Sequence, residues 1–148
     1  MARKSTYHSG MAGVYHVAAQ LAEREFSVGI TVGNTPHVDL LVGTPDVKRT
    51  FSVQVKTNRK GGTQSFWLLS AKAKDTASKD FYYIFVNLRG HATRPDFYVV
   101  SSQVVAKDLV VGSGKSTGWF CFPRNEIYRE KWETLNAQTS TAVECPGS

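Results

Sequence analysis

The stretch FSVQVKTN, residues 51–58, decides the fold, because it combines the pattern of a buried strand with two polar side chains. Side chains of a strand alternate between its two faces, so the phenylalanine and the two valines point one way while Gln54 and Lys56 point the other. The apolar side predicts a strand inside the protein. The polar side needs a partner, which is either solvent at the edge of a sheet or a polar site.

The strand predicted before it, HVDLLVG at residues 37–43, carries an acid among apolar residues. The same alternation places His37 and Asp39 on one face of this strand. A buried carboxylate is unfavourable unless it is paired or binds a cation. A Thr-Pro-Asp turn joins the two strands as a hairpin, so we expect Asp39 to share a face with Gln54 and Lys56.

Two interpretations of this polar group remain open. An Asp39–Lys56 ion pair would fix the register of the hairpin and do no chemistry. A carboxylate, an amide and an ammonium group can instead hold a metal ion and a water molecule. Asp46 is a rival for the acid, but Gly-Thr-Pro-Asp before a basic bend is turn chemistry, so we prefer Asp39.

The remaining patterns predict an α/β fold around one mixed sheet. Residues 10–25 carry apolar side chains at helical spacing, with Val14, Val17 and Leu21 in one stripe. Further strands are predicted at 26–32, 66–69, 81–89 and 96–101, a weak helix at 71–80 and a helix at 101–110. We expect a sandwich in which helices flank a central mixed sheet of about five strands. Residues 1–135 form a single domain in this prediction, and residues 136–148 form a polar, flexible tail.

The composition is that of a globular protein with a basic surface. The chain has 148 residues, a formal net charge of +6 and a pI near 9.4. Such a charge permits a polyanionic partner such as DNA, because lysine and arginine release counterions from phosphates. Cys121 and Cys145 make no disulfide framework or zinc motif, and no apolar stretch has the length of a membrane span. We therefore expect a cytoplasmic protein without a membrane partner.

An acid strand, a turn and a strand that ends in Gln-x-Lys resemble the PD-(D/E)xK nuclease superfamily, which includes restriction enzymes and Holliday-junction resolvases. The predicted element order over residues 10–105 is similar to the core of that family, and so is Ala-Gly-Val-Tyr at 12–15 in the first helix. The resemblance implies a restriction endonuclease-like sandwich. It also implies a metal-dependent DNA endonuclease that hydrolyses phosphodiester bonds.

The resemblance assigns a role to each matching residue. Asp39, the side-chain oxygen of Gln54 and the backbone carbonyl of Val55 would bind Mg²⁺ or Mn²⁺, because hard cations prefer oxygen ligands. Lys56 would orient the attacking water or help to deprotonate it, while the metal stabilises charge on the phosphate.

Two residues depart from the pattern of the family. Gln54 replaces the usual acid, which removes one negative charge from the site, and Val14 stands where similar proteins carry glutamate after Ala-Gly. Glu23 lies nine positions beyond Val14, about half a revolution away at 3.6 residues per turn, so we expect it to face solvent. Gln20 and His37 are candidates for a second layer of polar groups around the site.

Other features bear on partners. The basic residues that flank the site and could contact nucleic acid are Lys48, Arg49, Arg59 and Lys60. GSGKST at 112–117 is no Walker A loop, because Leu109 occupies the position of its first glycine, so no nucleotide cofactor is expected.

Other functions and states stay open. One is a catalytically inactive module of the same fold that binds nucleic acid or a protein partner, and another is an interaction protein without affinity for nucleic acid. A domain without a separate target-recognition domain is also compatible with a homodimer.

Overall fold

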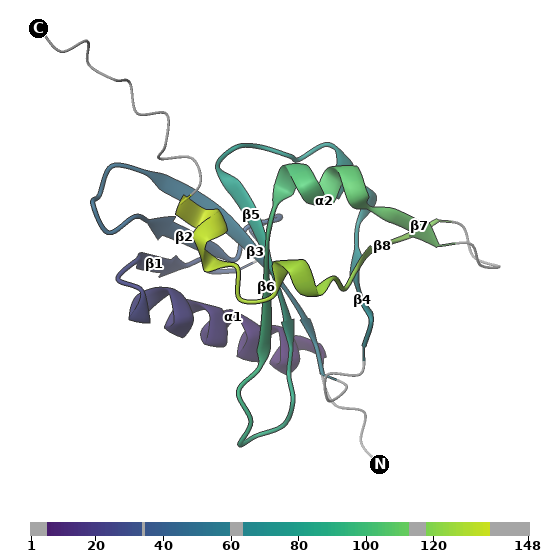
Figure 1. The fold of residues 1–148 in the computed structure, drawn as a ribbon, viewed down its shortest axis with the longest axis horizontal. Helices are drawn as coiled ribbons and strands as arrows, with labels where there is room; N and C mark the ends of the chain where they lie inside the picture. Colours follow the sequence, from purple (N-terminus) through teal and green to yellow (C-terminus); the bar gives the residue numbers. More distant parts are fainter. Residues whose placement is uncertain (1–5, 34, 60–63, 113–117, 137–148) are drawn as a thin grey trace, which may run out of the picture.

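A computed structural model describes residues 6–33, 35–59, 64–112 and 118–136 of the chain (Figure 1). Its centre is a five-stranded sheet in the order β1-β2-β3-β5-β6. The strands are β1 Ser27–Ile30, β2 Leu40–Gly43, β3 Thr50–Asn58, β5 Phe81–Asn87 and β6 Asp96–Ser101. β3 and β5 are parallel and the other neighbouring pairs are antiparallel, so the mixed sheet agrees with the prediction.

The helix α1, Thr6–Glu23, covers one face of this sheet. Its predicted stripe of Val14, Val17 and Leu21 is buried and packs on the apolar side chains of β2, β3, β5 and β6. Gly13 permits a close approach, since a Cβ added to it would lie 1.8 Å from Oγ1 of Thr57 on β3. The helix therefore lies directly against the end of β3.

The helix ends earlier than predicted, at Glu23 rather than at residue 25. Glu25 has a positive φ of 67°, and Phe26 N–H donates to the Leu21 carbonyl across the helix end at 3.1 Å. These features form a Schellman motif, in which a left-handed residue stops the helix and its orphan carbonyls are satisfied. The motif usually places glycine at the left-handed position, so glutamate there gave no sequence signal.

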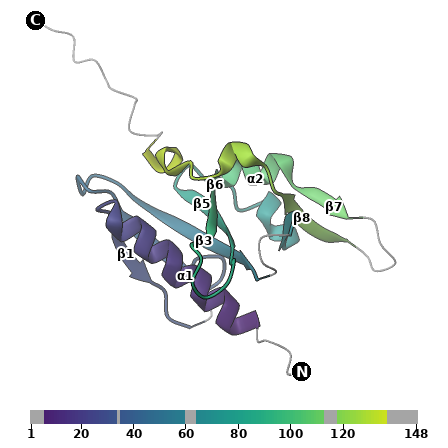
Figure 2. The ribbon, with the colours of Figure 1, turned by 60° about the horizontal axis from the view of Figure 1, so that its bottom comes forward.

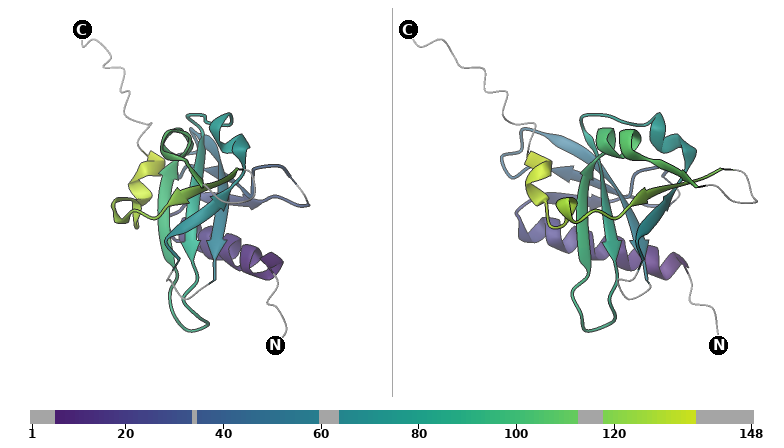
Figure 3. Two further views of the ribbon diagram at one scale, coloured as in Figure 1. Left: turned by 90° about the vertical axis from the view of Figure 1, so that its right-hand side faces the viewer. Right: turned by 45° about the vertical axis from the view of Figure 1, so that its right-hand side comes forward.

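A second layer covers the other face of the sheet. It contains a three-stranded antiparallel sheet in the order β4-β8-β7, the helix α2 and a short 3-10 helix η1. Their bounds are β4 Phe66–Leu69, η1 Ala71–Lys74, α2 Ser102–Asp108, β7 Val110–Gly112 and β8 Trp119–Pro123. Figures 2 and 3 show α1 and the β7–β8 pair on opposite sides of the central sheet. The sandwich is therefore three layers deep.

Aromatic packing holds this second layer in place. The Trp67 ring lies 5.0 Å from the Phe85 ring and 5.2 Å from the Tyr98 ring, and its Nε1–H donates to the carbonyl of Val86 at 3.1 Å. The Phe122 ring stacks on Phe85 from β8. Buried indole groups need such a partner for the N–H, so one side chain fixes β4 on β5.

Several boundaries differ from the prediction. β4 and β6 match it residue for residue, whereas α2 stops at Asp108 and the valines after it form β7. β7 and β8 were not predicted. The 3-10 helices η2, Glu126–Tyr128, and η3, Trp132–Asn136, then carry the chain back past β6. Neither α1 nor α2 combines the length and apolar character that a membrane span requires.

Candidate active site at the open end of β3

The candidate site lies where β3 extends beyond β2. β2 pairs with β3 only from Gly43↔Thr50 to Leu40↔Val53, while β3 continues to Asn58. Asp39 immediately precedes β2, and its N–H donates to the Val53 carbonyl at 2.9 Å. The paired register ends at Leu40↔Val53, so Asp39 bonds to the residue opposite Leu40 and not to Gln54. The predicted strand over 37–43 is thus shorter than expected, and a positive φ of 63° at His37 explains its late start.

The Asp39 carboxylate binds the backbone of β3. Its Oδ2 accepts a hydrogen bond from the N–H of Val55 at 2.7 Å. This oxygen takes the place of the main-chain carbonyl that a longer β2 would offer to Val55. The short distance is typical of a hydrogen bond to a charged acceptor. Thr31 fixes the main chain of Asp39, because its N–H donates to the Asp39 carbonyl at 3.0 Å. The carboxylate is therefore held at the edge of β3.

Gln54 and Lys56 lie on the face of β3 that points away from α1, as the alternation predicted. Both are half-buried, and their neighbours on β5 are Tyr83 and Phe85. Lys56 also lines a hollow of about 180 Å³ with Asn58, Gln64, Phe66, Trp67 and other residues of β3 and β4. The Lys56 side chain is thus partly shielded from solvent and shares this hollow with two aromatic residues of β4.

Burial lowers the pKa of the Lys56 ammonium below its ordinary value of 10.5, and the negative charge of Asp39 acts in the opposite direction. The two groups therefore interact electrostatically. No ion pair among the described residues joins them, however, because the carboxylate is bound to the Val55 amide instead. The simple ion pair that would only fix the hairpin register is not formed.

The oxygen groups at this edge suit a hard cation in type but carry little charge. Asp39 contributes one carboxylate and Gln54 an amide oxygen. The Val55 carbonyl points to the same side as the Val55 N–H, because both groups of one strand residue face one edge. In the described part of the chain, no three His, Cys, Asp or Glu side chains are placed so that they could hold a metal ion together. A divalent ion here would have one protein carboxylate and would depend on other oxygen ligands, such as those of a phosphate.

The structure places the helix residues away from this group. Val14 is 6% exposed and belongs to the apolar core. Glu23 is exposed, as predicted. Gln20 lies at the far side of α1, where its Oε1 accepts from Arg24 at 3.0 Å and from Arg94 at 2.9 Å. Neither glutamate nor glutamine from α1 therefore stands in for the acid of the family pattern.

The rival acid Asp46 lies at the other end of the hairpin. Its Oδ1 accepts from the Thr44 hydroxyl at 2.6 Å and from the Lys48 N–H at 3.1 Å. The hydrogen bond from Thr44 is the main cause that lowers the pKa of this carboxyl. Asp46 is thus the turn residue that the sequence indicated.

The predicted phosphate contacts have different surroundings. Lys48 and Arg59 are exposed, and Lys60 lies outside the described residues. Arg49 points inward: its guanidinium donates to Asp80 at 3.2 Å, to the Tyr82 hydroxyl at 2.7 Å and to the Leu135 carbonyl at 2.8 Å. These bonds join the β2–β3 turn to β5 and η3, so we leave Arg49 out of the surface that could meet nucleic acid.

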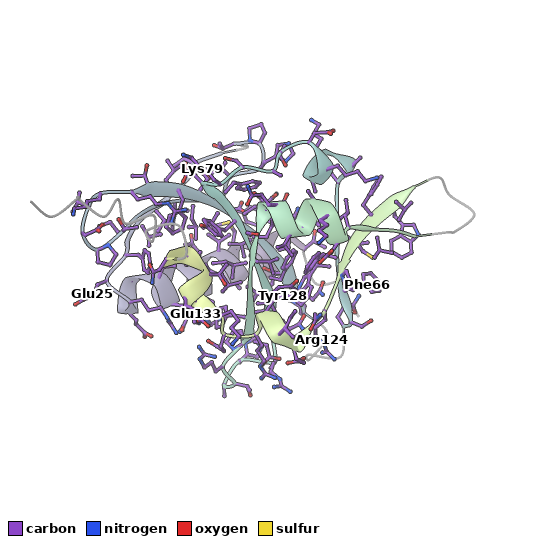
Figure 4. All side chains as sticks on the ribbon, turned by 45° about the horizontal axis from the view of Figure 1, so that its top comes forward. Glu25, Phe66, Lys79, Arg124, Tyr128 and Glu133 are labelled. Carbon is purple, nitrogen blue, oxygen red and sulfur yellow. The ribbon has the colours of Figure 1, made fainter. Side chains whose placement is uncertain are left out.

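Two contributors to the site were not predicted. The Val55 amide binds Asp39, and a periodic pattern gives no sign of a main-chain partner. Asn58 holds the next element, because its Nδ2–H donates to the Phe66 carbonyl at 2.7 Å and draws β4 beside Lys56. Its position two residues after Lys56, on the same face, was the available signal. Figure 4 shows Phe66 on the side of the molecule opposite Glu25, which lies two residues beyond the end of α1.

These features define an α/β protein with a central mixed sheet and a polar group at the open end of its middle strand. Its fold is similar to the solved structure of the bacterial homing endonuclease I-Ssp6803I, with a TM-score of 0.59 and 15% sequence identity. The match covers 91% of this chain and 95% of that chain. No protein-family model and no curated protein matches the sequence. At this identity the likeness concerns the fold alone.

Proposed function

We propose that the chain is a metal-dependent DNA endonuclease of the PD-(D/E)xK type. The observation that carries the proposal is the hydrogen bond between the Asp39 carboxylate and the Val55 amide, at the open end of the strand that bears Gln54 and Lys56. The similar fold of a homing endonuclease supports it over most of both chains. The basic net charge of +6 suits a polyanionic substrate.

Each residue of the group has a part in this proposal. Asp39, the Gln54 amide oxygen and the Val55 carbonyl would hold Mg²⁺ or Mn²⁺, which when bound polarises the phosphate and lowers the pKa of water. The Val55 N–H fixes the orientation of the Asp39 carboxylate. Lys56 donates hydrogen bonds to the water or phosphate, and its lowered pKa makes proton exchange at Nζ easier than in an exposed lysine.

A plasmid-nicking assay with Mg²⁺ or Mn²⁺ tests the proposal. Asp39→Asn keeps an oxygen that can accept from Val55 but removes the charge, so we expect it to abolish cleavage, and Lys56→Gln to do the same. Asp46→Asn is the matched control for the first change and Lys107→Gln, on α2, for the second. Cleavage by Asp39→Asn at the wild-type rate, or equal loss in Asp46→Asn, would exclude the assigned site.

A second candidate function is a nucleic-acid-binding module that does not cut. The burial of Val14 in the core favours it, because α1 then supplies no carboxylate and the site has a single negative charge. Binding of DNA that depends on salt, without cleavage under any metal condition, would identify this function. Absence of both binding and cleavage would favour an interaction protein.

A further inference from the structure

Two further hollows lie at the end of β3, and one of them adjoins the hollow lined by Lys56. Arg59 follows the last residue of β3 and is exposed. It makes no hydrogen bond, ion pair or ring contact with any residue in the described ranges, unlike the partly buried Arg49. Within the described residues, Arg59 is therefore a positive charge without an acidic partner, and it directly follows the strand that bears Lys56.

One hollow, of about 230 Å³, lies between α1 and the loop that connects β5 with β6. Its polar lining consists of His16, Arg59 and His91, all exposed, together with Ala12, Leu88 and Gly90. The loop turns at Gly90, whose φ of 117° is a conformation that other residues rarely adopt. Three nitrogen-bearing side chains from α1, the end of β3 and this loop thus meet at one concave surface.

A second hollow, of about 190 Å³, lies on the other side of Arg59, against the start of α1. It is lined by Thr6, Ser9, Thr57, Asn58, Arg59 and Gln64, which carry hydroxyl and amide groups. The first turn of α1 adds the positive end of the helix dipole. Among the described residues, no Asp or Glu lines either hollow, and α1 has no Asp, Glu, Lys or Arg from Thr6 to Ala22. Both hollows therefore suit an anion and oppose a cation.

We propose that Arg59 and these two hollows bind successive backbone phosphates of the DNA strand that passes Lys56, and lead that strand along the first half of α1. A guanidinium group binds phosphate through two parallel N–H donors, and imidazole and hydroxyl groups add further donors. These contacts are with the DNA backbone, so they position the DNA strand without reading its base sequence. This inference rests on the proposed action on DNA.

The test measures DNA affinity by fluorescence anisotropy over a series of salt concentrations, with divalent ions removed. The probes are a short duplex and a single strand of the same sequence, with full-length protein. We expect Arg59→Gln to weaken binding of both by about 10-fold and to reduce the slope of log K against log salt by about 1. The double variant His16→Ala/His91→Ala should weaken binding about threefold, as expected for lost neutral hydrogen bonds.

Lys107→Gln on α2 removes the same charge as Arg59→Gln and is the matched control, which should leave the slope unchanged. If Arg59→Gln changes affinity and slope no more than this control, the phosphate site is wrong although the protein binds DNA. If the wild-type protein binds neither probe, both this inference and the proposed function fail. Because all three side chains are exposed, thermal melts of the variants should match the wild type.

Discussion

The contact between α1 and β3 can be tested with two glycines of the same helix. Gly13 lies against Thr57, and an added Cβ would lie 1.8 Å from Oγ1, 3.0 Å from Cβ and 3.1 Å from Cγ2 of that threonine. Rotation of the threonine side chain cannot relieve all three contacts, because its Cβ does not move. One turn earlier, a Cβ added to Gly10 would meet nothing within 4 Å. Alanine should therefore have opposite effects at the two positions.

The expected change in the free energy of unfolding follows from two opposing effects, helix propensity and overpacking. Replacing glycine by alanine inside a helix stabilises by about 1 kcal/mol, which is the full effect expected for Gly10→Ala. At Gly13 the same gain is opposed by overpacking that costs about 1–3 kcal/mol. Gly13→Ala should thus be about 1–3 kcal/mol less stable than Gly10→Ala. For a domain of this size that difference is roughly 3–12 °C in melting temperature.

Urea unfolding and thermal melts of the two variants provide the measurement. The Thr57 hydroxyl oxygen is buried and has no hydrogen-bond partner among the described residues, so Thr57→Ala should cost little and should reduce the penalty of Gly13→Ala in the double variant. The reasoning fails if Gly13→Ala stabilises the protein as much as Gly10→Ala does, because α1 then does not approach β3 as closely as the structure has it.

Three further predictions concern contacts that hold the fold. Arg49→Lys should destabilise the protein by about 2–4 kcal/mol in urea unfolding. The reason is that an ammonium group cannot replace a guanidinium group that donates to a carboxylate, a phenol and the Leu135 carbonyl. An unchanged urea midpoint would contradict this. Glu25→Gly should stabilise by about 1 kcal/mol, because glycine adopts the left-handed conformation at the end of α1 without strain; a lower melting temperature would argue against the motif. Burial favours the neutral form of Glu130, but hydrogen bonds from Arg94 and Trp132 outweigh burial and lower the pKa of its carboxyl. The ionised Glu130 therefore stabilises the fold above pH 4.5, the pKa of the unfolded state, and this contribution is lost as the pH falls through the lower pKa of the folded state. Below pH 4.5 the stability of Glu130→Gln should thus fall less steeply with pH than that of the wild type.

The sequence predicted the parts of the fold whose signals are local. β4 and β6 match their predicted bounds, and β3 begins one residue before the stretch 51–58 and ends with it. Alternation in β3 assigned the buried and half-buried side chains correctly, because a strand covered on both faces keeps the period of two. The stripe of α1 was found for the same reason, since 3.6-residue spacing directly decides which side chains meet the sheet.

Features set by distant parts of the chain were not predictable in this way. β7 and β8 exist because β8 pairs with β4, a strand more than 50 positions away, and the valines of β7 also suit the end of a helix. In the sequence Arg49 belongs to a basic bend, but in the structure it donates hydrogen bonds to β5 and η3. Asp39 was identified from its unfavourable place among apolar residues, but its hydrogen bond to a main-chain amide depends on where β2 begins.

The beginning of β2 also bears on the two interpretations of Asp39, the ion pair that fixes the register and the metal site. A pair that only fixed the register of the hairpin would gain most by bringing the carboxylate and the Lys56 ammonium together, because both are half-buried and each lowers the desolvation cost of the other. In the structure the carboxylate is held instead by the Val55 amide, and Lys56 extends beside Trp67 and Phe66. The Asp39 carboxylate and the Lys56 side chain therefore have different neighbours. Under the proposed function, a bound cation would complement the carboxylate and a phosphate would complement the lysine.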